Sequence, residues 1–260
     1  MSTTQQDAGS VPDFTALHVP GAPLVLVNVW DAGSARIVAT AGATAIATGS
    51  WSVAAAMGLE DGEQVSVANL VALTREIAAA ADTLPLTVDA ERGYADTPSG
   101  VADVVAQLAA AGAVGCNLED GTAAGGVRPV KEQAEVLTAV RERLPGFHVN
   151  ARTDLFLNGP AAEHRTHVED AIARGRAYAA AGASSFFVPG LVELPLIERI
   201  VAEVPLPVNV MVLSPDADLH RRLAAAGVAR ISHGPAPYLA VSEALAAYTR
   251  TVVGAVEQTA

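Results

Sequence analysis

Short apolar segments alternate with longer amphipathic ones along nearly the whole chain. The short segments are rich in valine, isoleucine and alanine, as buried strands are, and the longer ones have the spacing of helices with one apolar face. We predict strands at residues 24–29, 44–48, 86–89, 114–119, 147–152, 184–188, 207–211 and 228–232. Helices are predicted at 33–41, 65–81, 129–143, 166–181, 192–204, 214–226 and 239–253, and another opens at Thr97-Pro98.

The junctions between these elements carry helix caps and turn glycines. Thr166 and Glu169 have the spacing of a capping box, and Ser214-Pro215 is expected to cap the helix that follows it. An alanine–glycine pair recurs between a helix and the next strand, at Ala41-Gly42, Ala111-Gly112, Ala181-Gly182 and Ala226-Gly227. Glycine at such a position adopts the left-handed conformation that closes a short turn.

Strands and helices that alternate regularly along the whole chain predict an α/β fold, and specifically a (β/α)8 TIM-type barrel. The competing architecture is a doubly wound sheet, but no GxGxxG turn follows the first strand and the strands continue to the C-terminus. We therefore expect a single barrel domain at residues 21–260 after a polar lead-in at residues 1–20.

Composition excludes several classes of function. The chain has 260 residues, 51% of them hydrophobic, and a net charge of −12, which disfavours nucleic acid and anionic membranes as partners. No apolar stretch is long enough to span a bilayer, and a single cysteine fits a reducing, cytoplasmic compartment. Lys131 is the only lysine and begins a helix, so a Schiff-base mechanism is not expected.

Acidic residues gather where two neighbouring strands end. Asp89 and Glu91 are spaced two apart, so on a strand they would point the same way, and Glu119 ends the next strand. Oxygen ligands of this kind suit Mg²⁺ or Mn²⁺. The alternative is that these acids pair with arginines in a structural network, with candidates Arg92, Arg128 and Arg152.

Other polar residues fall at the strand ends, where a barrel places its site. They are Thr48, Gly49 and Ser50 after the second strand, Asn117 on the fourth, Arg152 on the fifth, Asn209 on the seventh and His233 after the eighth. His233 is a general acid/base candidate by position. Tyr94, beside the acids, is a proton donor or a packing residue.

Several motifs in order resemble the isocitrate lyase/phosphoenolpyruvate mutase superfamily over roughly residues 20 to 240. They are Asn28-Val29-Trp30-Asp31-Ala32, Thr48-Gly49 leading to Gly58-Leu59-Glu60-Asp61, Val88-Asp89-Ala90-Glu91-Arg92-Gly93-Tyr94, Asn117-Leu118-Glu119-Asp120 and Asn150-Ala151-Arg152-Thr153-Asp154. The resemblance implies an (α/β)8 barrel whose last helix is exchanged between subunits of a homo-oligomer, a tetramer or a dimer. It also implies a Mg²⁺ site and a small α-oxo- or α-hydroxycarboxylate as substrate.

The resemblance also implies roles for individual residues. Asp89 and Glu91 match the metal-binding pair, Glu119 the next acid, and Asp61 an outer acid that holds metal-bound water. Thr48-Gly49-Ser50 matches the turn that binds the substrate's acidic group through backbone N–H groups, and Arg152 matches the arginine that binds the same end. Glu91 departs from the aspartate common in the family, which favours a water-bridged or rearranged coordination.

The expected function is a Mg²⁺-dependent carbon–carbon lyase that forms an enolpyruvate-like intermediate. Lyases of the family carry a cysteine in the loop after the fourth strand, but residues 120–128 contain no cysteine, lysine or histidine here. Cleavage of isocitrate or methylisocitrate by the usual acid is therefore doubtful. The alternatives are a phosphonate mutase or hydrolase, and a catalytically weak barrel that binds carboxylates.

Overall fold

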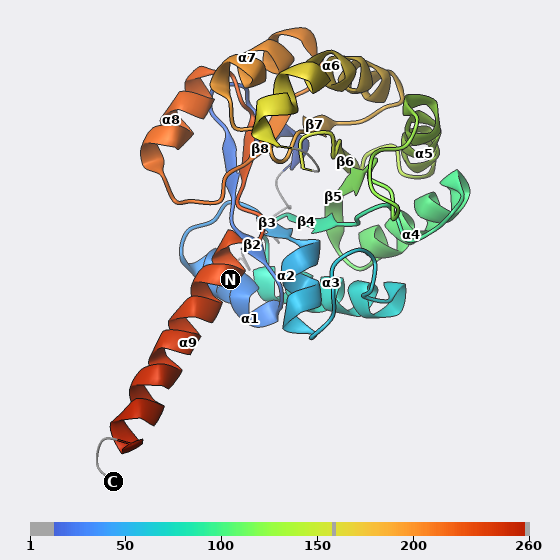
Figure 1. Ribbon diagram of the computed structural model, residues 1–260. Coiled ribbons are helices and arrows are strands. Elements are labelled where there is room, and N and C mark those ends of the chain that lie inside the picture. The colour runs from blue at the N-terminus through green and yellow to red at the C-terminus, as the bar shows by residue number, and fades with distance from the viewer. Residues whose placement is uncertain (1–12, 158–159, 258–260) are drawn as a thin grey trace, which may run out of the picture.

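A closed barrel of parallel strands forms the centre of the molecule. The computed structural model describes residues 13–157 and 160–257 (Figure 1), so part of the predicted lead-in, residues 1–12, lies outside the described residues. The described strands are β1 (Leu24–Leu26), β2 (Asn28–Val29), β3 (Ile46–Thr48), β4 (Leu86–Asp89), β5 (Ala113–Glu119), β6 (His148–Arg152), β7 (Ser185–Phe187), β8 (Val208–Met211) and β9 (Arg230–Ser232).

The sheet closes through its first predicted strand. Residues 24–29 are split into β1, which pairs with β9, and β2, which pairs with β3. All the other neighbours follow chain order and are parallel. β1 and β2 are two consecutive segments of one barrel strand, so the described strands make an eight-stranded barrel. The predicted (β/α)8 fold is therefore confirmed.

Helices pack around the barrel and bury most of its outer face (Figure 1). They are α1 (Ala32–Thr40), α2 (Ser50–Ala56), α3 (Val67–Ala81), α4 (Pro98–Ala110), α5 (Val130–Arg143), α6 (His164–Ala180), α7 (Leu194–Glu203), α8 (Ala217–Ala225) and α9 (Ala236–Glu257), with 3-10 turns η1 (Thr15–Leu17) and η2 (Ala161–Glu163). The core between the two layers is aliphatic: Val88, Val149 and Val210 of the strands belong to one buried cluster with Leu108 and Ile200 of the helices. No helix in the described part of the chain has both the length and the apolar character needed to cross a membrane.

Two predicted helix caps are wrong, and one helix was not predicted. α6 begins at His164, so Thr166 lies inside it, where its hydroxyl donates to the Glu163 carbonyl. Asp216, not Ser214, caps α8, because its carboxylate accepts from the N–H groups of the first turn. The short helix α2 begins directly after β3 without any side-chain cap, so the sequence carries no start signal for it.

The interior of the barrel below its C-terminal mouth is polar. His148 Nε2 is 2.9 Å from the Ser185 hydroxyl, which donates to Asn150 Oδ1 at 2.7 Å. Asn150 Nδ2 in turn donates to Asn117 Oδ1 at 2.8 Å. His148 is thus a core residue, and this column of hydrogen-bonded side chains ends at the mouth.

The segment before β1 closes the opposite end of the barrel. Phe14 and His18 are buried there, and the His18 ring stacks on His148 with centroids 4.2 Å apart. Thr15 Oγ1 is 3.1 Å from His148 Nδ1. Residues 13–18 of the predicted lead-in therefore pack as part of the barrel.

The last helix leaves the body of the protein. α9 projects away from the barrel (Figure 1), and its exposed apolar side chains include Leu239, Val241, Leu245, Tyr248, Val252 and Val253. Its base is anchored where the Tyr238 ring meets Trp30 and Trp51, at centroid distances of 5.0 and 5.9 Å. On the barrel itself, Val25 of β1 is 39% exposed and Ile37 of α1 is 70% exposed. β1 and α1 thus have an apolar surface that no other part of the described chain covers.

Candidate active site

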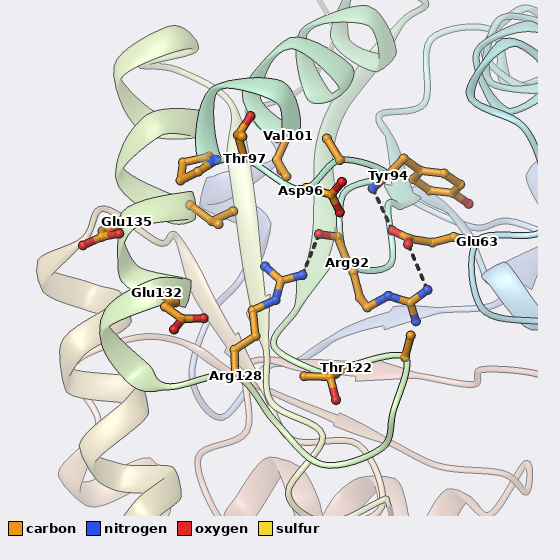
Figure 2. Close-up of a pocket in the computed structure, with 15 residues that line it drawn as sticks. Glu63, Arg92, Tyr94, Asp96, Thr97, Val101, Thr122, Arg128, Glu132 and Glu135 are labelled. Carbon is orange, nitrogen blue, oxygen red and sulfur yellow. Dashed lines mark hydrogen bonds and ion pairs between the residues drawn. The ribbon is translucent and has the colours of Figure 1, made fainter.

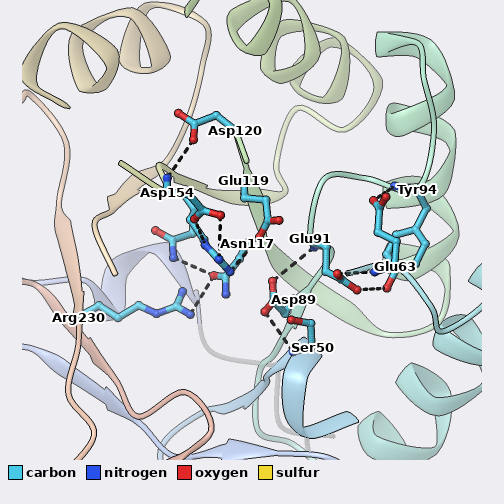
Figure 3. A network of polar contacts seen from close by, with 12 residues as sticks. Ser50, Glu63, Asp89, Glu91, Tyr94, Asn117, Glu119, Asp120, Asp154 and Arg230 are labelled. Atoms are coloured by element: carbon cyan, nitrogen blue, oxygen red, sulfur yellow. Dashed lines mark hydrogen bonds and ion pairs between the residues drawn. The ribbon is translucent and has the colours of Figure 1, made fainter. Parts of the chain in front are cut away.

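A small cavity of about 170 Å³ opens at the C-terminal ends of the strands. It is lined by Asn28, Gly49, Ser50, Trp51, Ser52, Asp61, Asp89, Asn117, Arg152, Leu157, Phe187, Pro189, Met211, Ser232, Gly234 and Pro235. This is the end at which barrel enzymes hold their catalytic residues. Of the predicted site residues, Gly49, Ser50, Asp61, Asp89, Asn117 and Arg152 are brought together here. Figure 3 shows Ser50, Asp89 and Asn117 among them.

Asp89 is held in place by its neighbours on β3 and α2. Its backbone N–H donates to the Thr48 hydroxyl at 2.9 Å, and its Oδ2 accepts from the Ser50 backbone N–H at 3.2 Å. The Asp89 side chain is buried at the cavity wall. Thr48 and Ser50, predicted to bind substrate, therefore position this carboxylate in the structure.

Glu91 does not share a strand face with Asp89, so the premise of that prediction is wrong. β4 ends at Asp89, and Glu91 has a left-handed backbone with φ of 47°. Its Oε1 accepts from the Tyr94 hydroxyl and its Oε2 from the Glu63 backbone N–H, both at 2.6 Å (Figure 3). The alternation of side chains along a strand no longer applies once the backbone turns.

Glu119 and Arg152 form an ion pair at the mouth. Arg152 Nη1 lies 2.9 Å from Glu119 Oε2. On its other side, Arg152 Nε and Nη2 donate to the two Asp154 oxygens at 2.6 and 3.1 Å. The alternative that strand-end acids pair with arginine thus holds for Glu119. The acid that pairs with Arg92 is instead Glu63, in the loop before α3.

Negative charge is in excess around the cavity. Burial raises the pKa of Glu119 to about 8 against the opposing effect of Arg152. Burial also raises the pKa of Glu91 to about 7, with Asp89 and Asp61 adding to the rise. At the rim, partial burial and the Asp89 charge raise the pKa of Asp61. A cation or protons would relieve this repulsion.

The predicted metal set is not assembled in the structure. Over residues 13–157 and 160–257, no three His, Cys, Asp or Glu side chains converge as a group that could hold a metal ion. Glu91 is engaged by Tyr94 and Glu63, and Glu119 is engaged by Arg152. Asp89 and Asp61 are the predicted metal acids that line the cavity.

His233 and Asn209 do not line the cavity. His233 follows β9 and is not among the lining residues, and its ring lies 5.2 Å from that of His220 on α8. Asn209 is fully buried in the barrel, where its Oδ1 accepts from the Ser232 hydroxyl at 3.3 Å. The catalytic role predicted for His233 is therefore not supported by its position.

Two residues at the site had no predicted role. Asn28 Oδ1 accepts from the backbone N–H groups of His233 and Gly234, and its Nδ2 donates to the Thr48 carbonyl. Asn28 thus links β2 to β3 and to the segment after β9. Arg230 is fully buried below the cavity and donates to Asn117 Oδ1 at 3.2 Å. An arginine within the apolar eighth strand was the available signal for it.

A buried ionic network supports the Arg152 side of the cavity. Asp120 Oδ1 accepts from the Asp154 backbone N–H at 3.0 Å. Asp120 Oδ2 accepts from Arg174 Nη1 at 3.0 Å and from the Tyr178 hydroxyl at 2.7 Å, both on α6. Asp120 thereby fixes the segment that carries Asp154, which in turn orients Arg152.

A larger cavity of about 720 Å³ lies to one side, between the loop after β4 and the start of α5 (Figure 2). Arg92 and Arg128 both border it, but Arg92 pairs with Glu63, and Arg128 donates to Gln133 and to the Arg92 carbonyl. Tyr94 is the only predicted site residue among those lining it. The smaller cavity is the candidate active site because it contains Asp89 and Arg152.

Comparison with known proteins agrees with this geometry. The family model of phosphoenolpyruvate phosphomutase matches residues 14–253. The chain belongs to this family. A protein from Burkholderia cenocepacia J2315, whose crystal structure is described as that of a phosphonomutase candidate, has 48% sequence identity to this chain. The two structures have a TM-score of 0.88, and the match covers 92% of this chain and 96% of that one.

Relatives of this family member include enzymes named for carbon–carbon cleavage. A 2-methylisocitrate lyase from Salmonella typhimurium is 32% identical over 221 residues, which is 75% of this chain and 71% of that protein. An oxaloacetate decarboxylase from Rhodopseudomonas palustris is 33% identical over 228 residues, 84% of this chain and 76% of that protein. The relatives of this chain thus include lyases, in a family that is named for a mutase.

Proposed function

We propose that this family member is a Mg²⁺-dependent carbon–carbon lyase of a small 2-oxo- or 2-hydroxycarboxylate, acting through an enolpyruvate-like intermediate. The observation that supports this most is that one small cavity at the strand ends contains both a buried, fixed carboxylate, Asp89, and an arginine, Arg152. The lyase and the decarboxylase among its relatives support the same reaction class.

The donor chemistry around Asp89 fits a Mg²⁺ ion. Mg²⁺ is commonly held by one or two carboxylates and keeps several waters, so it does not need three converging side chains. Asp89 would hold it directly, and Asp61, Glu91 and Glu119 would act through water or after rearrangement. When bound, the ion supplies Lewis-acid stabilisation of developing negative charge on oxygen.

The residues of the chain supply binding and orientation. Arg152 would hold the substrate carboxylate, with its guanidinium kept in place by Asp154. The backbone N–H group of Gly49 would contact the same end of the substrate, while that of Ser50 holds Asp89.

The bond that breaks in a 2-oxo acid is the carbon–carbon bond next to the enolate carbon. When it breaks, its electron pair passes to the 2-oxo oxygen. The other fragment leaves as carbon dioxide or as a carbonyl compound, and the enolate carbon then takes a proton. Glu119, which meets Arg152 at the mouth, would hold that proton, whereas Tyr94 lines the larger cavity and donates to Glu91.

A phosphonate substrate is the second candidate, supported by the similarity to the Burkholderia protein. A phosphonate carries more negative charge than a carboxylate. Arg152 is the one cationic residue of the described chain that lines the cavity, and Glu119 and Asp154 already occupy it. This charge balance favours the carboxylate.

We also propose that the protein is a homo-oligomer, a tetramer or a dimer, in which α9 packs on a second copy. The apolar residues along α9 are exposed within one chain, and so are Val25 and Ile37 on β1 and α1. Large apolar surface of this kind marks an interface. Each copy would supply the helix that the other lacks.

The test is Mg²⁺-dependent release of pyruvate from a panel of 2-oxo and 2-hydroxy acids, with phosphonopyruvate included. Asp89→Asn should lower kcat on the order of 100-fold, as loss of charge stabilisation does in other enzymes. Asp96→Asn, an exposed acid outside this cavity, is the matched control. Arg152→Lys should mainly raise KM, because lysine lacks the two-pronged geometry.

Three outcomes separate the alternatives. Turnover of phosphonopyruvate alone would favour the mutase or hydrolase. Oxalate binding without turnover of any substrate would identify a carboxylate-binding barrel. Metal-independent turnover that survives Asp89→Asn would refute the proposal.

A further inference from the structure

Arg230 is a buried cation whose hydrogen-bond partners are uncharged. Its side chain is 0% exposed, its Nε donates to the Ser232 hydroxyl at 3.2 Å, and its Nη2 donates to Asn117 Oδ1 at 3.2 Å. The remaining nitrogen, Nη1, is buried and meets no hydrogen-bond partner among the described residues. Such a cation destabilises the fold, because no opposite charge in contact replaces its lost hydration. Packing alone therefore does not account for an arginine at this position.

The positive charge of Arg230 lies directly behind the cavity wall. Asn117 and Ser232, which accept from the guanidinium, both line the cavity. Figure 3 shows the Arg230 side chain extending to Asn117. Burial lowers the pKa of Arg230 to about 9, and the charge of Asp89 at the cavity wall opposes this fall. A ligand in the cavity would thus feel the charge of Arg230 without touching the guanidinium.

The contact with Arg230 also fixes which way the Asn117 amide points. A guanidinium has donors and no acceptor, so the Asn117 atom that it meets has to be the oxygen. Asn150 Nδ2 donates to the same oxygen at 2.8 Å. The Asn117 Nδ2 lies on the other branch of the amide, and none of the described residues accepts a hydrogen bond from it. Because Asn117 lines the cavity, this donor is available to a ligand.

We propose that Arg230 is a positioning residue, which holds the Asn117 amide so that Nδ2 donates to a negatively charged oxygen of the substrate. This inference rests on the proposed function, because it takes the ligand of the cavity to be an anionic acid. The positive charge behind Oδ1 polarises the amide and strengthens the donation from Nδ2. A donor that is already fixed in place needs no reorganisation when charge develops on the substrate. Asn117 would thus add a neutral donor to the charged contact from Arg152.

This arrangement acts in opposite directions on anions and cations. A fixed positive charge behind the wall attracts an acid and repels a Mg²⁺ ion held at Asp89. Loss of the Arg230 charge should therefore weaken binding of the acid, but should leave Mg²⁺ binding unchanged or make it tighter. A residue that only supports the fold would not separate the two ligands, because a loosened site binds both of them less well.

The experiment measures both ligands on the full-length protein by isothermal titration calorimetry, with Mg²⁺ alone and with oxalate at saturating Mg²⁺. Arg230→Met removes the charge and keeps a long, unbranched side chain. Oxalate should bind about tenfold or more weakly, as expected for the loss of a hydrogen bond strengthened by charge. Mg²⁺ should bind no more weakly than to the wild type. Arg176→Met, the same change at an exposed arginine that pairs with Glu203, is the control and should alter neither affinity.

Asn117→Asp tests the amide separately and does not depend on the folding of the first variant. The aspartate keeps an oxygen for Arg230 and replaces the Nδ2 donor with a second oxygen. Oxalate should again bind about tenfold or more weakly, because it loses a donor and meets a negative charge. Mg²⁺ should still bind. Thermal melting shows whether each variant is folded, and Asn117→Asp decides the matter if Arg230→Met is not.

The results distinguish failure of this inference from failure of the proposed function. If the wild-type protein binds oxalate and Arg230→Met weakens Mg²⁺ binding as well, Arg230 only supports the fold. If either folded variant binds oxalate as tightly as the wild type does, the positioning role is overturned. The proposed function survives both of these results. If the wild-type protein binds no oxalate with Mg²⁺ present, the proposed function is overturned, and the inference falls with it.

Discussion

Replacing Asp120 by asparagine should destabilise the protein far more than the same change at Asp170, although both acids pair with Arg174. Asp120 is 0% exposed and accepts from Arg174, from the Tyr178 hydroxyl and from the Asp154 backbone. The asparagine oxygen can keep either the two bonds from Arg174 and Tyr178 or the one from the Asp154 backbone. The negative charge is lost, and the amide NH₂ then faces another donor. Breaking a buried ion pair from one side costs about 3–5 kcal/mol.

Asp170 supplies the control. Its side chain is 46% exposed and lies 3.2 Å from Arg174 Nε. An exposed pair of this kind contributes below about 1 kcal/mol. Urea unfolding followed by tryptophan fluorescence, at one protein concentration for all variants, measures both free energies of unfolding. Equal losses in the two variants would refute the reasoning that burial decides the cost.

Three further predictions concern pH, the site and assembly. Burial lowers the pKa of His18 from 6.5 to about 4. As pH falls the unfolded state binds the proton first, so stability is complete above about pH 6.5 and about 3 kcal/mol of it is lost by pH 4. Urea unfolding of His18→Gln at the two pH values should show a smaller loss. Gly121→Ala places a Cβ 2.6 Å from Asp154 Oδ2 and should lower kcat/KM, whereas Gly146→Ala, with nothing within 4 Å, should not. Tyr248→Ser on α9 should shift the oligomer toward monomer in light scattering, and an unchanged mass would contradict the interface.

The barrel could be predicted because its pattern is repeated and local. Each apolar strand is followed by an amphipathic helix, and a glycine marks the turn back into the next strand. The positions of Asp89 and Arg152 followed, since a barrel gathers the ends of its parallel strands at one face. These inferences needed only the order of elements along the chain.

The finer geometry depended on where each strand ends, which the pattern does not define. Glu91 lies two residues past the end of β4, where its backbone is left-handed, so a rule for strands misplaced it. His233 was a candidate because it directly follows the eighth strand, but its ring lies beside His220 on α8 and it does not line the cavity. A position next to a strand end does not by itself fix which way a side chain points.

Other features depend on contacts between distant parts of the chain. Phe14 and His18 look like part of a polar lead-in, but they pack against His148, more than a hundred residues away. Arg230 meets Asn117 across the inside of the barrel. Neither contact has a signature within a local window of sequence.

Phe14 and His18 fill the far end of the barrel, and buried side chains such as Asn150 and Arg230 fill its interior. The candidate active-site cavity therefore opens at the strand ends. If the proposed lyase reaction takes place there, both products would leave through this one opening. The fragment nearer the opening would leave first, and the deeper fragment would block the next turnover until it left.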